Sequence, residues 1–195
     1  MSKSYISSSL TFYDNKIVVE DSGSHHNGTE VMMDWEHPIM SASAAYVTRN
    51  GGDILEVGFG MGISAGYMHS HSISSHTIIE NHPQIIPKAV EWSSGKSNVT
   101  IVSQSWEDVN SNLGRFDGIF YDIFADSTSD EYFSASLSNV VKPETKCTFF
   151  TGGMGGDISS FPYLSFVKSF QEININPPSN GYYSGSVYYM PKAEF

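Results

Sequence analysis

The sequence predicts an α/β fold built on a doubly wound, mostly parallel sheet. Two observations predict it: short apolar strands alternate with helical patterns between Asp53 and Phe170, and the first strand runs directly into a glycine-rich turn. Two further strand candidates near the C-terminus have turn residues and no helix between them. They predict an antiparallel hairpin at or near one edge, which brings the sheet to seven strands.

The elements are expected in a regular order. Strands are expected where short apolar runs are bounded by turn residues, over residues 53–57, 77–80, 99–102, 116–121, 148–151, 173–175 and 186–190. Helices are expected over residues 38–49, 63–69, 83–92, 106–113, 130–141 and 158–170. Pro143 is expected to end the fifth of these helices. Residues 1–30 are expected to form a loosely organised leader or lid, ahead of one domain over 31–195.

The composition limits the partners of the chain. It has 195 residues, of which 39% are hydrophobic and 13% aromatic, enough for one sizeable core. There are 21 acidic against 10 basic residues, a formal net charge of −11. This balance disfavours nucleic acids and anionic membranes and favours a small cationic or neutral substrate. With one cysteine, Cys147, and no visible secretory signal or membrane span, we expect a cytoplasmic monomer or homodimer.

The turn after the first strand reads Glu56-Val57-Gly58-Phe59-Gly60-Met61-Gly62. Glycines there allow a tight turn and the close approach of a ligand to the backbone. Glu80, at the end of the second strand, can accept hydrogen bonds from a ribose diol. A purely structural turn is the alternative, but the strand, the helix and the downstream acid together favour an adenosine cofactor.

The spacing of the glycines indicates which adenosine cofactor the turn binds. Dinucleotide-binding turns read Gly-x-Gly-x-x-Gly and hold a pyrophosphate, whereas this turn reads Gly-x-Gly-x-Gly and follows Glu56. A carboxylate is unfavourable beside a pyrophosphate and favourable beside an ammonium. S-adenosyl-L-methionine has no phosphate and carries both an ammonium and a sulfonium. A methyltransferase is therefore favoured over a dehydrogenase.

Several motifs resemble those of guanidinoacetate N-methyltransferase and the related fungal arginine delta-N-methyltransferases, in the same order and at similar spacing. They are VMMDWEHPIM (31–40), LEVGFGM (55–61), IIE (78–80), WEDV (106–109), FDGIFYD (116–122), KP (142–143) and YYMP (188–191). The resemblance runs from about Val31 to the end of the chain. It implies a Rossmann-like class I methyltransferase fold, with S-adenosyl-L-methionine as cofactor and S-adenosyl-L-homocysteine as its product.

The resemblance also implies the residues of two sites. Around the cofactor it places Met32, Met40, Gly58, Phe59, Gly60, Met61, Gly62, Ile63, Glu80, Asn81, Trp106, Glu107 and Asp122. The charge argument above adds Glu56 to this set. On the guanidino group of the substrate the resemblance places Glu36 and Asp122, with the backbone of Gly152 and Gly153 near the other end of the substrate.

The chemistry of a guanidine explains why two carboxylates are needed. A guanidinium has no free lone pair, because its pKa lies above about 12, so it must lose a proton before or during attack. Two carboxylates can orient its N–H groups. We expect Asp122 to be the general base and Glu36 to be the second arm, which raises the proton affinity of Asp122 through like charge. Helix or strand-end capping by either acid is the structural alternative.

The chain departs from the family pattern at three places. Pro143-Glu144-Thr145 replaces Pro-Gly-Gly, and residues 152–156 differ. An N-terminal tryptophan that covers the cofactor has no equivalent, so Phe12 or Tyr13 is expected to replace it. No metal site is expected, because the histidines at 69, 71 and 76 lack an adjacent carboxylate cluster.

The predicted function is an S-adenosylmethionine-dependent N-methyltransferase that acts on the guanidino group of a small molecule, guanidinoacetate-like or arginine-like. Two alternatives stay open. One is methylation of an arginine in a protein. The other is a cofactor-binding protein that has lost catalysis.

Overall fold

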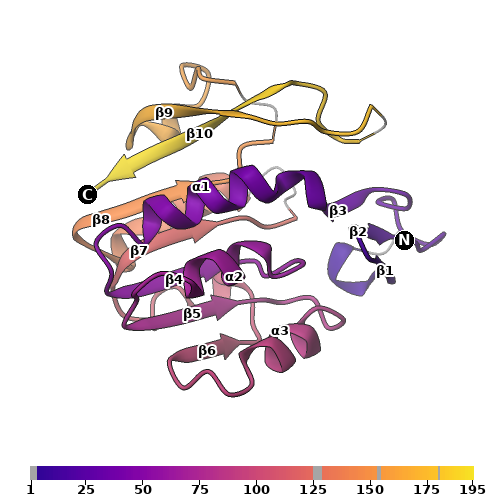
Figure 1. Ribbon diagram of the computed structural model, residues 1–195, viewed down its shortest axis with the longest axis horizontal. Helices are drawn as coiled ribbons and strands as arrows, with labels where there is room; N and C mark the ends of the chain where they lie inside the picture. The colour runs from indigo at the N-terminus through magenta and orange to yellow at the C-terminus, as the bar shows by residue number, and fades with distance from the viewer. Residues whose placement is uncertain (1–3, 125–128, 153–154, 180) are drawn as a thin grey trace.

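The computed structural model describes residues 4–124, 129–152, 155–179 and 181–195. Its main sheet has seven strands in the order β6-β5-β4-β7-β8-β10-β9 (Figure 1). They are β4 (Asp53–Val57), β5 (Ser75–Ile79), β6 (Val99–Val102), β7 (Phe116–Tyr121), β8 (Val141–Phe149), β9 (Val167–Asn174) and β10 (Val187–Glu194). Neighbouring strands from β6 to β8 are parallel, and β10 is antiparallel to both β8 and β9. The predicted parallel sheet with a C-terminal antiparallel hairpin is confirmed.

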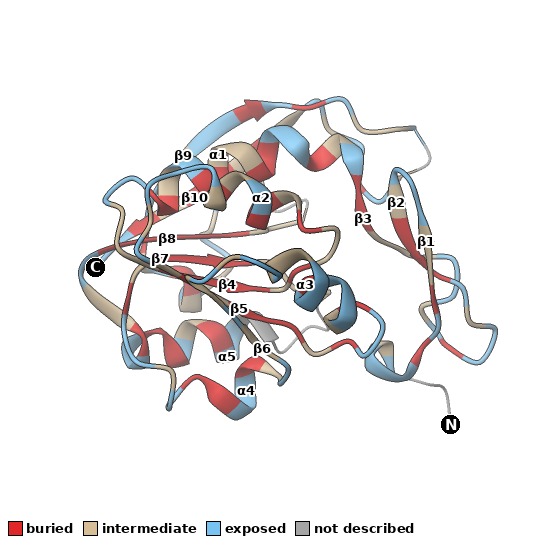
Figure 2. Ribbon diagram, turned by 60° about the horizontal axis from the view of Figure 1, so that its bottom comes forward, coloured by how far each residue is buried: buried red, intermediate tan, exposed pale blue. Residues whose placement is uncertain are grey.

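Helices cover both faces of this sheet (Figure 2). On one face lie α1 (His37–Val47), α2 (Ile63–His69) and α3 (Ile86–Ser93), and on the other α4 (Trp106–Val109) and α5 (Ser129–Ser136). Nearly every residue of β4 and β7 is buried, which explains why these strands read as continuous apolar runs. In the part of the chain that the structure describes, no helix combines the length and apolar character needed to cross a bilayer.

The N-terminal residues form a small sheet of their own. It consists of β1 (Leu10–Tyr13), β2 (Lys16–Val19) and β3 (Glu30–Met33), preceded by a 3-10 turn, η1 (Tyr5–Ser7). These residues are better organised than the expectation of a loose leader or lid, because Ile17 and Val19 pack in one cluster with Phe59 of the glycine turn. The small sheet lies beside the carboxyl ends of β4 and β5 (Figure 1). The division at residue 30, which falls at the start of β3, stays a prediction.

The helix expected over 158–170 is wrong. Among the described residues of this segment the helical part is one 3-10 turn, η4 (Pro162–Leu164), and β9 follows from Val167. Pro162 lacks an N–H and is unsuited to a helix interior. Pairing with β10, in the register Ile173↔Tyr188, overrides the local apolar spacing.

The end of the fifth helix also differs from the expectation. Helix α5 ends at Ser136 and is followed by η3 (Leu137–Asn139), whereas Pro143 lies inside β8. A strand tolerates proline where its ladder is irregular. The pairing of β8 with β7 shifts register beside Pro143, and Glu144 has a φ of 69°.

Candidate functional site

The central strands end in step at one edge of the sheet. The pairs Val57↔Ile79, Val57↔Tyr121 and Ile79↔Val102 place the last residues of β4, β5, β6 and β7 side by side. The residues that follow, Gly58, Glu80 and Asp122, are therefore brought together where open α/β sheets bind ligands. The backbone N–H of Asp122 donates a 2.8 Å hydrogen bond to the Val57 carbonyl.

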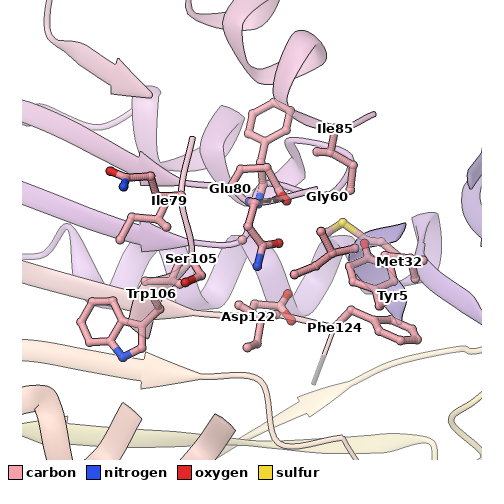
Figure 3. Close-up of a pocket in the computed structure, with 18 of the residues that line it drawn as sticks. Tyr5, Met32, Gly60, Ile79, Glu80, Ile85, Ser105, Trp106, Asp122 and Phe124 are labelled. Carbon is pink, nitrogen blue, oxygen red and sulfur yellow. Dashed lines mark hydrogen bonds between the residues drawn. The ribbon is translucent and has the colours of Figure 1, made fainter. Parts of the chain in front are cut away.

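A cavity of about 420 Å³ lies at this edge, between the strand ends and the N-terminal segment. Tyr5 and Phe124 lie together at one end of it and Trp106 at the other, with Asp122 between them (Figure 3). The residues expected around a cofactor that line it are Met32, Gly58, Phe59, Gly60, Glu80, Asn81, Trp106, Glu107 and Asp122. The tertiary structure thus gathers most of the expected set around one cavity.

The glycine turn forms the floor of this cavity. Gly58 has a φ of 92°, and a Cβ there would lie 1.8 Å from the carbonyl oxygen of Asp122. Only glycine fits at that position. The carboxylate of Glu80 accepts hydrogen bonds from the N–H groups of Phe59 at 2.9 Å and His82 at 2.8 Å. Burial raises the pKa of Glu80, and these hydrogen bonds oppose the rise. Glu80 therefore holds the glycine turn against β5 in addition to lining the cavity.

Other expected cofactor residues are not among the described lining residues. They are Met40, Glu56, Met61, Gly62 and Ile63. Met40 lies on α1 and is fully buried in the core. Glu56 is also fully buried, accepts a hydrogen bond from the hydroxyl of Ser64, and lies 2.9 Å from Nε2 of His76. Successive residues of a strand point to opposite faces, and Glu56 points toward α2. A role for these residues in cofactor binding stays a prediction.

Sequence reasoning missed Tyr5. Its ring packs against Phe124 and against His82, with centroids 4.3 Å and 4.9 Å away. Neither Phe12 nor Tyr13, the expected replacements for the family tryptophan, lines the cavity: Phe12 packs under the ammonium of Lys88, and Tyr13 is exposed. No local pattern marks Tyr5, because its position depends on how η1 folds back over the sheet edge.

Gln104 and Ser105 line the cavity as well and were also missed. Here a signal exists in the sequence. Both residues follow β6, which ends at Val102, and residues just beyond parallel strands lie at the ligand-binding edge.

Glu36 lies at the end of a 3-10 turn, η2 (Asp34–Glu36), and its side chain is buried. Its Oε1 accepts hydrogen bonds from the N–H of Met33, at 2.7 Å, and from the hydroxyl of Tyr182. Burial raises the pKa of Glu36 to about 7, and the two hydrogen bonds limit the rise. No side-chain hydrogen bond from Glu36 caps α1. The carboxylate does cap η2, because the N–H from which it accepts a hydrogen bond belongs to Met33, the residue before that turn.

The negative charge of Glu36 affects the pKa of Asp122. The pKa of Asp122 is raised well above its usual range by burial and then by the negative charges of Glu36 and Glu56. Asp122 lines the cavity, whereas Glu36 and Gly152 are not among its described lining residues. Gly152 lies in the turn after β8 with a φ of 57°, and Gly153 falls outside the described residues.

The charges around the cavity suit a cationic ligand without phosphate. Three acids, Glu80, Glu107 and Asp122, are among its described lining residues. The described lining residues include no lysine and no arginine. A sulfonium and an ammonium fit this environment, and a pyrophosphate does not. The volume is also typical of a site for a small organic cofactor.

The comparisons with known proteins agree with this geometry. A family model described as guanidinoacetate N-methyltransferase matches residues 11–181. The chain belongs to this family. Protein arginine N-methyltransferase 2 from Aspergillus oryzae is 39% identical over 162 residues, which cover 78% of this chain and 37% of that protein. The protein of the same name from Saccharomyces cerevisiae is 32% identical over 168 residues, or 80% of this chain and 39% of that protein.

Solved structures share the fold of this guanidinoacetate N-methyltransferase family member. The N-methyltransferase NodS from Bradyrhizobium japonicum WM9, in complex with S-adenosyl-L-homocysteine, superposes with a TM-score of 0.66 at 12% identity, covering 82% of this chain and 87% of that one. Spermidine synthase from Thermotoga maritima gives a TM-score of 0.64 at 15% identity, covering 95% and 72%. At such identities the likeness shows the class I methyltransferase fold alone.

Family membership and fold together show that the chain is a class I methyltransferase domain of the guanidinoacetate N-methyltransferase family. The chain spans little more than a third of the length of the first curated relatives, 37% of the Aspergillus oryzae protein.

Proposed function

We propose that the chain transfers a methyl group from S-adenosyl-L-methionine to a guanidino nitrogen of a small cationic molecule, guanidinoacetate-like or arginine-like. The observation that carries the proposal is a pair of carboxylates, the buried Glu36 and the half-buried Asp122 of the cavity wall, in which the charge of Glu36 raises the pKa of Asp122. Two acids whose negative charges oppose each other are costly unless a cation joins them. A planar guanidinium, with several N–H donors, suits both at once.

We assign the cofactor to the cavity at the sheet edge, against Gly58, Gly60 and Trp106. S-adenosyl-L-methionine, when bound, supplies an electrophilic methyl group on a sulfonium. The glycines leave their backbone open to the ligand, and Tyr5 together with Phe124 shields the cavity from water.

The two carboxylates have different tasks in this proposal. Glu36 accepts N–H groups of the guanidinium and fixes its plane. Asp122, which lines the cavity, accepts the proton that the attacking nitrogen must lose. Its raised pKa suits a base, because a carboxylate of ordinary pKa is too weak to take a proton from a guanidinium.

A second candidate substrate is an arginine side chain in a protein. Its support is the name of the relatives, Protein arginine N-methyltransferase 2. The same two carboxylates would hold the same guanidino group, so the chemistry on this chain is unchanged. The difference lies in what surrounds the guanidine.

A direct test measures S-adenosyl-L-homocysteine binding by calorimetry and then methyl transfer to guanidinoacetate, free arginine and an arginine-containing peptide. Turnover of either small guanidine supports the proposal. Turnover of the peptide alone moves the assignment to a protein substrate. Cofactor binding without turnover of any guanidine contradicts both and favours a binding protein that has lost catalysis.

A further inference from the structure

Tyr182 reaches the proposed guanidino site from a distant part of the chain. It lies in the connection between β9 and β10, 146 positions after Glu36, and its hydroxyl donates a hydrogen bond to Oε1 of Glu36. In Figure 1 the β9–β10 hairpin runs over α1, and its connection extends toward the region where β3 leads into α1. The contact therefore joins the last hairpin of the chain to the N-terminal end of α1.

The hydrogen bonds of Glu36 are unevenly distributed over its two oxygens. Oε1 accepts both the N–H of Met33 and the hydroxyl of Tyr182. Among the residues that the structure describes, no hydrogen bond reaches Oε2. A carboxylate held in this way has one oxygen satisfied by the protein and the other available to a ligand.

The ring of Tyr182 is held by neighbouring aromatic side chains. It packs against Trp35, with centroids 5.5 Å apart, and Trp35 also contacts Tyr183 at 5.7 Å. The hydroxyl of Tyr183 donates to the carbonyl of Val187 at 2.8 Å, within the same hairpin. Tyr182 is 40% exposed and Glu36 only 2%, so the hydrogen bond joins a surface tyrosine to a buried carboxylate.

We propose that Tyr182 is a positioning residue for the guanidino site, which orients Glu36 through Oε1 and leaves Oε2 to receive a guanidinium N–H. This inference rests on the proposed function. An O–H donor to a carboxylate stabilises the ionised form, which is the form that binds a cation. The charged or titratable neighbours of this pair are Asp122, at the end of β7, and Glu30, on β3.

The pH behaviour of Glu36 should report this role. The hydrogen bond from Tyr182 lowers the pKa of Glu36 against the opposing effect of burial. Removing the hydroxyl should therefore raise that pKa, so that Glu36 becomes neutral over a wider range of pH. Binding of a cationic guanidine should then require a higher pH than in the wild type.

The test compares Tyr182→Phe with Tyr183→Phe, which removes one hydroxyl from the same loop and leaves Glu36 untouched. Carboxyl ¹³C NMR follows the titration of Glu36, and kinetics give KM and kcat for the guanidine that the wild type turns over. We expect Tyr182→Phe to raise the pKa of Glu36 and to increase KM about tenfold near pH 7, with S-adenosyl-L-homocysteine affinity within twofold of wild type. Tyr183→Phe should change neither the titration nor KM.

The outcomes separate this inference from the function on which it rests. An unchanged Glu36 titration and an unchanged KM in Tyr182→Phe overturn the positioning role while leaving the proposed function intact. A shifted titration in a protein whose wild type turns over no guanidine keeps the Tyr182–Glu36 link and overturns its assignment to substrate. An equal loss of activity in both variants, with no shift of the titration, indicates a structural role for the loop and also overturns the inference.

Discussion

The ring of Tyr5 stacks on the ring of Phe124, with centroids 4.3 Å apart and planes inclined by 21°. Phe124 lies in the segment that follows β7, two residues after Asp122. The stacked rings therefore form one end of the cavity. The stack joins the N-terminal segment to the candidate site. It predicts that the first residues of the chain contribute to cofactor affinity.

Tyr5→Ala should weaken S-adenosyl-L-homocysteine binding about tenfold, because it removes an aromatic wall of the cavity. Calorimetric titration measures the change. Tyr13→Ala is the matched control, since Tyr13 is an exposed tyrosine of the same N-terminal region and does not line the cavity. Equal affinity for Tyr5→Ala and wild type would show that the cofactor lies elsewhere.

Asp122→Asn should lower kcat for a guanidino substrate by roughly 100-fold or more, because an amide cannot accept the proton of the attacking nitrogen. S-adenosyl-L-homocysteine affinity should change only severalfold, since the shape of the side chain is kept. Single-turnover methyl transfer and calorimetry measure the two quantities. Asp14→Asn, in the exposed β1–β2 turn, is the control. Retained turnover in Asp122→Asn would exclude this residue as the base.

Glu36 should make stability depend on pH. Its pKa in the folded protein is about 7, above the ordinary 4.5. The stability that the neutral carboxyl contributes is therefore complete below about pH 4.5 and is lost as the pH rises to about 7. Glu36→Gln keeps a neutral side chain at every pH. The free energy of unfolding of the variant minus that of wild type should therefore rise by up to about 3 kcal/mol between pH 4.5 and pH 8.

Urea denaturation at several pH values measures this difference. The same Glu36→Gln protein should bind a cationic guanidine far more weakly than wild type at pH 8, because the charge that attracts the ligand is gone. A stability difference that stays constant from pH 4.5 to pH 8 would contradict the raised pKa.

Gly58→Ala should abolish cofactor binding and destabilise the fold. The added Cβ would meet the carbonyl oxygen of Asp122 at 1.8 Å, at a φ of 92° that alanine rarely adopts. Gly66→Ala, in α2, meets nothing within 4 Å and should instead stabilise the protein by about 0.5–1 kcal/mol. Thermal denaturation and calorimetry on both variants test the contrast. A Gly58→Ala protein with normal affinity would mean that the turn can rearrange.

Much of the fold and part of the site could be predicted because the signals are local. The bounds of β4, β6 and β7 agree with the expected strands, since short apolar runs between turn residues are visible without knowledge of the partners. Once parallel strands are recognised, the residues after them must meet at one edge. Gly58 and Glu80 follow from this reasoning, Asp122 from the family resemblance, and their place around one cavity agrees with the expectation.

Local sequence was therefore enough to predict the alternation of strand and helix, the glycine turn and the acidic residues at the strand ends, because each of these features depends on a few neighbouring residues. Tertiary structure alone decided that residues 167–174 pair as a strand, that Tyr5 closes the cavity, and that Tyr182 reaches Glu36. These features depend on contacts between segments far apart in the chain. Their free energy comes from pairing, stacking and burial that no local spacing of residues records.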